Sequence, residues 1–319
     1  MSASHSTCSP DSAGVLARRS WHKAWTGAIW VYKILIPISL FTFLLDASHV
    51  LNRLEGVLGP VMGLIHLPSK AAMPLIAGLL TGIYGGIAAL SALSFTLKEA
   101  TLIAVFLLTA HNLIQESIIQ GQAGLHPVKA ALYRLGAALA LVWLIGWLWQ
   151  GGAGPAPYAT LTAGTIPFGA AFLNWCRNTL ILSAQIFGIL IVIMSAVVWM
   201  KAYRWDERLA VRLRPVLKSL GLSEKAGLLW LAAVLFGVTY GAAVIVEEAR
   251  NGALSPSEIE RLHLSIGINH SMVEDPVLFL PLGIHPFWVW VPRLLAAVAA
   301  VQLLRLFHAL RAGLCRNKT

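Results

Sequence analysis

The stretch NHSMVEDPVLFLPLGIHP, residues 269–286, decides the fold because it places ionisable side chains inside an apolar segment. The chain around it, from about residue 262 to residue 307, is apolar enough to lie in a membrane. A charged side chain at the centre of a membrane-inserted helix costs about 2.5–3.5 kcal/mol on insertion scales, and residues that carry this cost are candidates for a functional site. His270, Glu274 and Asp275 therefore predict a polar site at membrane depth.

The composition of the 319-residue chain predicts an integral membrane protein. Hydrophobic residues make up 57% of the chain and charged residues 12%, whereas soluble domains carry about 25% charged residues. The mean hydropathy is +0.72. Apolar runs of about 20 residues are long enough for membrane-spanning helices, so we predict an all-α, polytopic membrane protein. The runs lie at 26–45, 73–94, 100–119, 130–149, 178–199, 227–246, 262–282 and 286–307.

The net charge of +10 indicates membrane topology and not a nucleic-acid partner. Basic residues cluster before the first run, in the loop 201–225 and at the C-terminus. Such clusters beside spans mark the cytoplasmic side of a membrane protein. We therefore expect a protein of the inner (plasma) membrane with both termini in the cytoplasm. The three cysteines are scattered, which predicts neither a disulfide framework nor a thiolate metal site.

The chain is internally duplicated. A shift of 159 residues aligns HNLIQESIIQGQAGLHPVKAALYRLGAA (111–138) with HSMVEDPVLFLPLGIHPFWVWVPRLLAA (270–297) without a gap. Upstream, a shift of 155 residues aligns Gly82 with Gly237. Polar residues are rare in membrane segments, so their agreement in one register indicates two repeats. The aligned polar pairs are His111 with His270, Glu116 with Asp275, His126 with His285, and Arg134 with Arg293.

The two repeats are predicted to have opposite orientations in the membrane. The basic N-terminus lies inside and the uncharged linker at 150–176 lies outside, so an odd number of crossings separates them. We predict that the third run of each half is a re-entrant hairpin, which leaves three membrane-spanning helices per half and makes an inverted tandem repeat. The predicted domains are a polar basic tail at 1–24, repeat 1 at 25–149, an exterior linker at 150–176, repeat 2 at 177–307 and a basic cytoplasmic tail at 308–319.

The two hairpins are predicted to bring their polar residues to one depth. His111 and His270 each follow an aligned glutamate, Glu99 or Glu258, by twelve residues, which is about 18 Å of helix. Because the hydrocarbon core is about 30 Å thick, both histidines would lie near its middle. Asp275 precedes a proline, so we expect the helix to break there.

The residue types at this depth suit a site for a metal ion or a polar solute. Imidazole and carboxylate together suit Fe(II), Mn(II), Zn(II) or Ni(II), and the absence of sulfur disfavours Cu(I). The alternative is internal pairing, in which Arg134 and Arg293 neutralise the acids and hold the halves together. His126 and His285 precede prolines and are expected to start helices at a turn. The predicted metal ligands are His111, Glu116, His270, Glu274 and Asp275, and the wider substrate site adds Asn112, Gln115 and Ser271.

At these residues the chain resembles the Gate-domain superfamily of nucleoside-recognition membrane proteins. The resemblance lies in motifs that occur once in each half. They are a glycine followed by a Tyr-Gly pair, at Gly82 and Gly237, and a segment that runs from a histidine to an acid. Each of these segments is followed by Gly-x-His-Pro and then by Arg-Leu. Related domains form the membrane part of GTP-dependent ferrous iron transporters, concentrative nucleoside transporters and spore maturation membrane proteins. The resemblance implies transport. Because neither predicted hairpin holds a cysteine and the chain has no GTPase motif, it does not extend to nucleotide-driven uptake or a thiolate iron site.

The function predicted from the sequence is secondary transport of a divalent transition-metal ion, which is substrate and not cofactor. One alternative is transport of a nucleoside-like or other small organic solute. Another is an accessory or assembly subunit that moves nothing. We expect no enzyme, because the spacing of His270 and Glu274 does not fit the HExxH pattern of metallohydrolases. The expected partners are the lipid bilayer, the substrate, and a second copy or another membrane protein.

Overall fold

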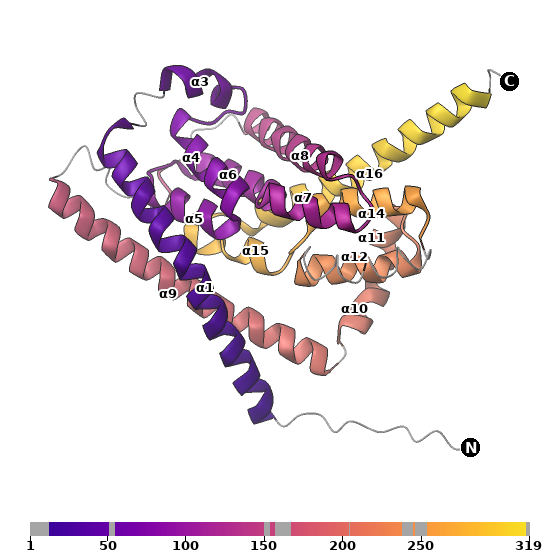
Figure 1. The fold of residues 1–319 in the computed structure, drawn as a ribbon, viewed down its shortest axis with the longest axis horizontal. Helices are drawn as coiled ribbons and strands as arrows, with labels where there is room; N and C mark the ends of the chain where they lie inside the picture. Colours follow the sequence, from indigo (N-terminus) through magenta and orange to yellow (C-terminus); the bar gives the residue numbers. More distant parts are fainter. Residues whose placement is uncertain are drawn as a thin grey trace.

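The computed structural model describes residues 13–50, 55–149, 154–156, 167–203, 205–237, 245 and 254–316. All named elements in this part of the chain are helical, and the β pairing there is a single bridge between Thr96 and Pro155. The predicted all-α fold is therefore confirmed (Figure 1).

The described helices divide between the two halves of the chain. The first half contains α1 (Ala13–Ala47), α3 (Glu55–Gly63), the 3-10 turn η1 (Ser69–Ala71), α4 (Ala72–Thr81), α5 (Ile83–Ala92), α6 (Leu97–Ala110), α7 (Leu113–Gln122) and α8 (Pro127–Leu148). The second half contains α9 (Phe168–Ala202), α10 (Trp205–Arg212), α11 (Arg214–Ser219), α12 (Glu224–Phe236), α14 (Pro256–Asn269), α15 (Glu274–Val277), the 3-10 turn η2 (Leu280–Leu282) and α16 (Pro286–Arg316).

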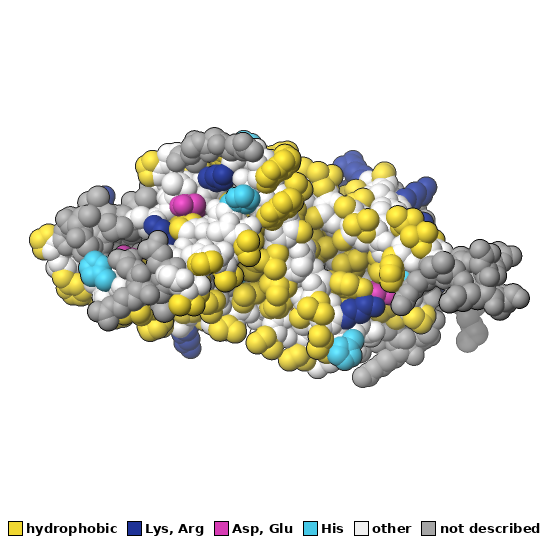
Figure 2. All heavy atoms as spheres, turned by 90° about the horizontal axis from the view of Figure 1, so that it is seen from above, with side chains coloured by type: hydrophobic (Ala, Val, Ile, Leu, Met, Phe, Trp, Pro, Cys, Tyr) yellow, Lys and Arg dark blue, Asp and Glu magenta, His cyan; other side chains and the backbone are white. Residues whose placement is uncertain are grey.

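Five helices of the described chain are long and apolar enough to cross a membrane. They are Gly14–Ala47, Leu97–Gln122, Pro127–Leu148, Phe168–Met200 and Pro286–Leu310. The protein is therefore a helical membrane protein with several candidate spans. On the face drawn in Figure 2, hydrophobic side chains form a band across the middle, and Lys and Arg side chains lie towards the two ends. Contiguous apolar surface on this scale is unusual for a soluble protein.

The helical hairpin of the first half lies in the second apolar run and not in the third, so the predicted position was wrong. Gly82 divides that run into α4 and α5, each of ten residues, or about 15 Å. Its φ of 90° and ψ of −176° are essentially confined to glycine. The two helices pack against each other, and a Cβ added at Gly86 would lie 3.3 Å from the Gly78 Cα.

The third run does not fold back on itself. Residues Leu97–Gln122 form one candidate span that is interrupted at His111 and Asn112, between α6 and α7. In the second half α14 ends at Asn269, and the short helix α15 packs against α9 and α16. The second run of this half, 227–246, starts in α12, and its residues 238–244 and 246 lie outside the described part of the chain.

Several predicted boundaries also differ from the helices. Helix α1 begins at Ala13, inside the predicted polar tail, because the arginines and lysine of that segment are good helix formers. Helix α9 begins at Phe168, inside the predicted linker, and α16 continues to Arg316. Most of the remaining linker lies outside the described residues. Residues Gly154–Ala156 are described, and they pair with the start of α6 and the chain just before it, through Leu97 N–H to Gly154 O and Ala156 N–H to Phe95 O, both at 3.0 Å.

The first helix of each half packs against the other in antiparallel direction (Figure 1). Trp21 near the start of α1 contacts Phe187, with ring centroids 5.8 Å apart. Further along α1, Ser39 accepts a hydrogen bond of 2.9 Å from Trp175 Nε1. Because residue numbers rise along α1 as they fall along α9, the two corresponding helices run in opposite directions.

The buried core consists of two main clusters, with the polar residues between them. One cluster surrounds α6, which is buried on nearly all sides, and the other joins α12, α14 and α16. Helices of one half pack against helices of the other: α8 packs against α14, and α6 packs against α16. The interrupted helices α6 and α14 are thereby brought to the centre of the molecule.

Candidate functional site

Two interrupted helices build the centre of the candidate site. Helix α6 starts with a capping box, in which the Thr96 hydroxyl accepts from Glu99 N–H and the Glu99 carboxylate accepts from Thr96 N–H. Helix α14 starts with half of this arrangement: the Ser255 hydroxyl accepts from Glu258 N–H, while the Glu258 carboxylate accepts from Ser223 N–H at 2.9 Å. Both helices end at a histidine and the following residue has a positive φ, 50° at Asn112 and 49° at Ser271.

The second interruption lies five residues before the position expected from the sequence. We predicted a break at Asp275, because it precedes a proline, but the break is at His270 and Ser271. Pro276 lies in the first turn of α15, where the missing N–H of proline is tolerated. As a result, His270 ends α14 and Glu274 begins α15, so the two residues lie on different helices.

Each interruption is tied to the end of a short apolar helix. Asn112 N–H donates to Gly78 O of α4 at 2.8 Å. In the second half the aligned bond runs from Ser271 N–H to Ala233 O of α12 at 3.3 Å, and Met272 N–H donates to Val234 O at 2.8 Å. Both short helices end at a glycine of positive φ, 90° at Gly82 and 85° at Gly237. The same backbone arrangement therefore occurs at the aligned positions of both halves.

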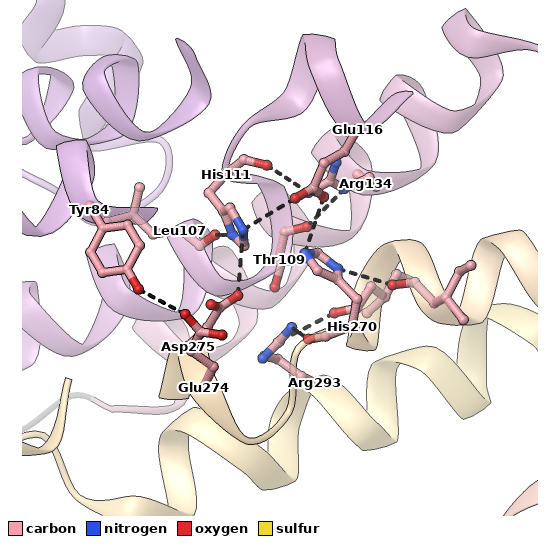
Figure 3. Close-up of polar contacts among 12 residues, drawn as sticks. Tyr84, Leu107, Thr109, His111, Glu116, Arg134, His270, Glu274, Asp275 and Arg293 are labelled. Carbon is pink, nitrogen blue, oxygen red and sulfur yellow. Dashed lines mark hydrogen bonds and ion pairs between the residues drawn. The ribbon is translucent and has the colours of Figure 1, made fainter. Parts of the chain in front are cut away.

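The two histidines at the interruptions lie side by side, with ring centroids 5.1 Å apart (Figure 3). Their Nδ1 atoms lie 2.8 Å from Leu107 O and 3.0 Å from Ile266 O. A carbonyl accepts only, so Nδ1 carries a proton in both rings, and Nε2 is the atom that can bind a metal ion when the ring is neutral. A hydrogen bond of this kind fixes the orientation of a metal-binding imidazole.

Three of the five predicted ligands form a compact donor set. His111 and His270 each offer a nitrogen and Asp275 a carboxylate oxygen, and the three atoms lie within 4.8 Å of one another. His111 Nε2 is 3.5 Å from Asp275 Oδ2. All three residues are buried. Since a first-row metal binds nitrogen and oxygen at about 2.0–2.2 Å, the set would close slightly around an ion.

The other two predicted ligands are held by different partners. Glu116 Oε2 lies 2.9 Å from Arg134 Nη2 and 3.2 Å from His270 Nε2, so this carboxylate is shared between an arginine and the histidines. Glu274 Oε1 accepts a hydrogen bond of 2.8 Å from the hydroxyl of Tyr84, which lies on α5 of the first half. Figure 3 shows both carboxylates beside the three-residue set.

Arg134 and Arg293 are fully buried and contact backbone carbonyls at the interruptions. Arg134 Nη2 donates to His111 O at 2.7 Å, and Arg293 Nη2 donates to His270 O at 2.9 Å. The predicted pairing of an arginine with a hairpin acid therefore occurs at Arg134 and Glu116. The carbonyl contacts were not foreseen.

A cavity of about 600 Å³ opens onto this site. All the residues predicted for the wider substrate site line it, together with Gly82 and Gly237. Tyr84, Trp30 and Lys33 also line the cavity and were missed. For Tyr84 a signal existed, because it belongs to the duplicated glycine and Tyr-Gly pattern. The predicted residues in the lining are His111, Asn112, Gln115, Glu116, His270, Ser271, Glu274 and Asp275.

His126 and His285 are absent from this cavity lining and stand at helix starts, as their sequence context predicted. His126 is the residue before Pro127, the first residue of α8. His285 precedes α16, and its Nδ1 accepts from Phe287 N–H at 3.2 Å.

Comparisons with known proteins support the resemblance to Gate proteins. Residues 28–120 match the family model for Gate, described as nucleoside recognition. This range contains α4, α5, α6 and nearly all of α7, and thus the first hairpin and the first interruption. The chain is also similar to the uncharacterized membrane protein YvoD of Bacillus subtilis (strain 168), at 29% identity over 276 residues, which cover 85% of this chain and 87% of that protein. No solved structure matches the chain significantly.

Proposed function

We propose that this protein is a secondary transporter of a divalent transition-metal ion, bound by His111, His270 and Asp275. The observation that carries the proposal is the convergence of their three donor atoms to within 4.8 Å, with one residue from the first half and two from the second. Two imidazoles and a carboxylate are ligands typical of Fe, Mn, Zn and Ni. The site opens onto a cavity through which an ion can arrive.

The proposed transporter is an inverted repeat in the inner membrane, with its termini in the cytoplasm. The antiparallel packing of α1 and α9 supports this arrangement, since these helices begin the two halves. In transporters built from inverted repeats, the substrate site lies near the bilayer midplane at discontinuous helices. The interruptions at His111 and His270 fit that pattern.

The first test of the proposal is ion flux in liposomes that contain the purified protein alone. We expect uptake of Mn²⁺ or Zn²⁺ that His270→Ala abolishes without lowering the yield of folded protein. His285→Ala is the matched control, because this exposed histidine stands at the start of α16 and is not among the residues that line the cavity. Absence of flux for every metal and nucleoside tried, with a second membrane protein co-purifying, would favour the accessory role.

A nucleoside-like solute is the second candidate, and the size of the cavity favours it. A volume of about 600 Å³ is typical of pockets for small organic molecules and exceeds the need of one ion. Trp30 and Tyr84 supply aromatic surface, and Asn112 and Gln115 supply amide groups. Binding of uridine or adenosine that Gln115→Ala weakens, with no metal bound in the same preparation, would replace the metal by this solute.

A further inference from the structure

We propose that Arg134 and Arg293 are positioning residues: each guanidinium fixes an interrupted helix to the next span and thereby aims the histidine at the shared site. The inference rests on the proposed function in one respect, because the aimed imidazoles are taken as ligands. The placement of the backbone by the arginines does not depend on which substrate is bound.

The first observation is a repeated pair of hydrogen bonds. In the first half, Arg134 donates from Nε to Thr109 O at 3.3 Å and from Nη2 to His111 O at 2.7 Å. In the second half, Arg293 donates from Nε to Ile268 O at 3.2 Å and from Nη2 to His270 O at 2.9 Å. Each arginine thus spans the carbonyl of the histidine and the carbonyl two residues earlier.

These carbonyls need a partner because the helix stops. The last carbonyls of a helix have no intrahelical donor, and a buried carbonyl without a partner costs about 1–3 kcal/mol. The guanidinium is a rigid fork that can serve two acceptors at once. Since α8 and α16 supply the arginines, the open end of each interrupted helix is joined to the following span.

The comparison of the two halves separates this role from charge pairing. Arg134 also contacts Glu116 at 2.9 Å, so its position alone would fit a salt bridge. Both arginines nevertheless make the same two carbonyl bonds, which are the contacts that the halves share. Two buried guanidiniums beside a cation site oppose cation binding by like charge. The position of the two arginines is therefore explained by the backbone carbonyls that they bind and not by attraction of a cationic substrate.

The same histidine is held at two points. Its carbonyl accepts from the arginine, and its Nδ1 bonds the carbonyl four residues earlier. With both ends fixed, Nε2 of each ring is directed at the space between the halves, where the rings approach to 5.1 Å (Figure 3). Loss of the arginine removes the hydrogen bond to the histidine carbonyl and leaves only the bond between Nδ1 and the carbonyl four residues earlier.

The test compares Arg134→Lys and Arg293→Lys with Arg305→Lys, an exposed arginine on α16 that contacts Gln302. Lysine keeps the charge but cannot make the forked pair. Co²⁺ serves as the probe, because its visible spectrum reports coordination geometry. For both site variants we expect Co²⁺ affinity to fall about tenfold or more, an altered spectrum, and faster amide hydrogen exchange within 109–113 or 268–272. Arg305→Lys should resemble the wild type.

Each outcome decides a separate point. Wild-type affinity, spectrum and exchange in both lysine variants would overturn the inference and show that charge is sufficient. Failure of both variants to fold would also overturn it, since the role would then be global stability. If the wild type binds no Co²⁺ while exchange still rises locally in the variants, the metal proposal fails and the positioning role stands.

Discussion

His111 and His270 occupy equivalent positions in the two halves, yet their surroundings differ by the acid that follows. In the first half the aligned acid is Glu116, which is engaged by Arg134 and lies within 3.5 Å of His111 Nε2. In the second half it is Asp275, which lies 3.5 Å from the histidine of the other half. The site is therefore shared between halves, and neither half holds the complete donor set.

A shared site predicts that the two histidines act as a unit. We expect His111→Ala and His270→Ala each to lose most of the metal affinity, and the double variant to lose little more, because residues in one site are not additive. Isothermal titration of the purified protein with Zn²⁺ measures the affinities. Binding should also weaken as the pH falls, because protons compete for the ligands. Strictly additive losses would leave two separate sites, and unchanged binding in the double variant would remove the metal site.

Tyr84 is predicted to hold Glu274 in place across the boundary between the halves. Its hydroxyl donates to Glu274 Oε1 at 2.8 Å, and a hydrogen bond to a charged group contributes about 1.5–3 kcal/mol. Tyr84→Phe should therefore lower the thermal unfolding temperature and shift the substrate affinity while leaving the chain folded. Tyr203→Phe is the control, because Tyr203 is an exposed residue after α9 and is not among those that line the cavity. Equal effects of the two substitutions would exclude a specific role of Tyr84.

The residues of the site were largely identifiable from the sequence because ionisable groups are conspicuous in apolar segments. His111, His270 and Asp275 stand out by type and by their aligned register. Tyr84 is marked only by the duplicated Tyr-Gly pattern, which does not reveal its role, because its partner Glu274 is 190 residues away in the chain. The carbonyl bonds of Arg134 and Arg293 were equally hidden, because they depend on where the preceding helix stops.

At the scale of elements, the hairpin was predicted in the wrong apolar run for an identifiable reason. A hairpin of two ten-residue helices and one long apolar helix have nearly the same length and hydropathy. Gly121 and Gly124 follow the end of the third run and resemble a turn in the sequence, whereas the turn between the two short helices is at Gly82. The single residue in a conformation that requires glycine could not be recognised without the backbone.

Gly82 is predicted to be intolerant of any side chain. Its φ of 90° is strained for other residues, although a Cβ there would meet only atoms of Asn112 at 3.9 Å. We expect Gly82→Ala to lower stability by about 1–3 kcal/mol through the backbone conformation alone. Gly136→Ala in α8 is the matched control, since a Cβ there meets nothing within 4 Å, and alanine is favoured in a helix by about 0.5–1 kcal/mol. Thermal unfolding in detergent measures both; equal stability of the two variants would contradict the requirement for glycine.

Across the whole molecule, the two halves are joined differently at equivalent positions. On one side Glu260 of α14 accepts from Tyr133 of α8 at 2.7 Å and lies beside Lys129 and His308. Under the 159-residue shift, Lys129 and His308 correspond to Trp288 and Trp149. These two tryptophans stack with ring centroids 5.3 Å apart. The contact between the halves is thus ionic at one of these positions and aromatic at the other. The two repeats share their backbone arrangement at the site, but they differ in the side chains that join them here.

The orientation of the halves follows from charge and from the packing of their first helices, and it is open to a direct test. Basic residues lie in the 201–225 loop, whereas the linker that starts at residue 150 has none. By the positive-inside rule we predict that the loop lies in the cytoplasm and the linker outside. An odd number of crossings between the N-terminus and this linker would also agree with α1 and α9 running in opposite directions.

We expect single cysteines at positions 154 and 218 to be labelled from opposite faces of the membrane. Gly154 and Lys218 are suitable because both are exposed in the described structure. Cys8, Cys176 and Cys315 are first replaced by serine so that each variant carries one thiol. A membrane-impermeant maleimide applied to intact cells should modify Gly154→Cys at once, and Lys218→Cys only after the cells are broken open. Labelling of both thiols from one face would require an even number of crossings between them. This result would contradict the inverted repeat, and with it the prediction that the two histidines lie at one depth in the membrane.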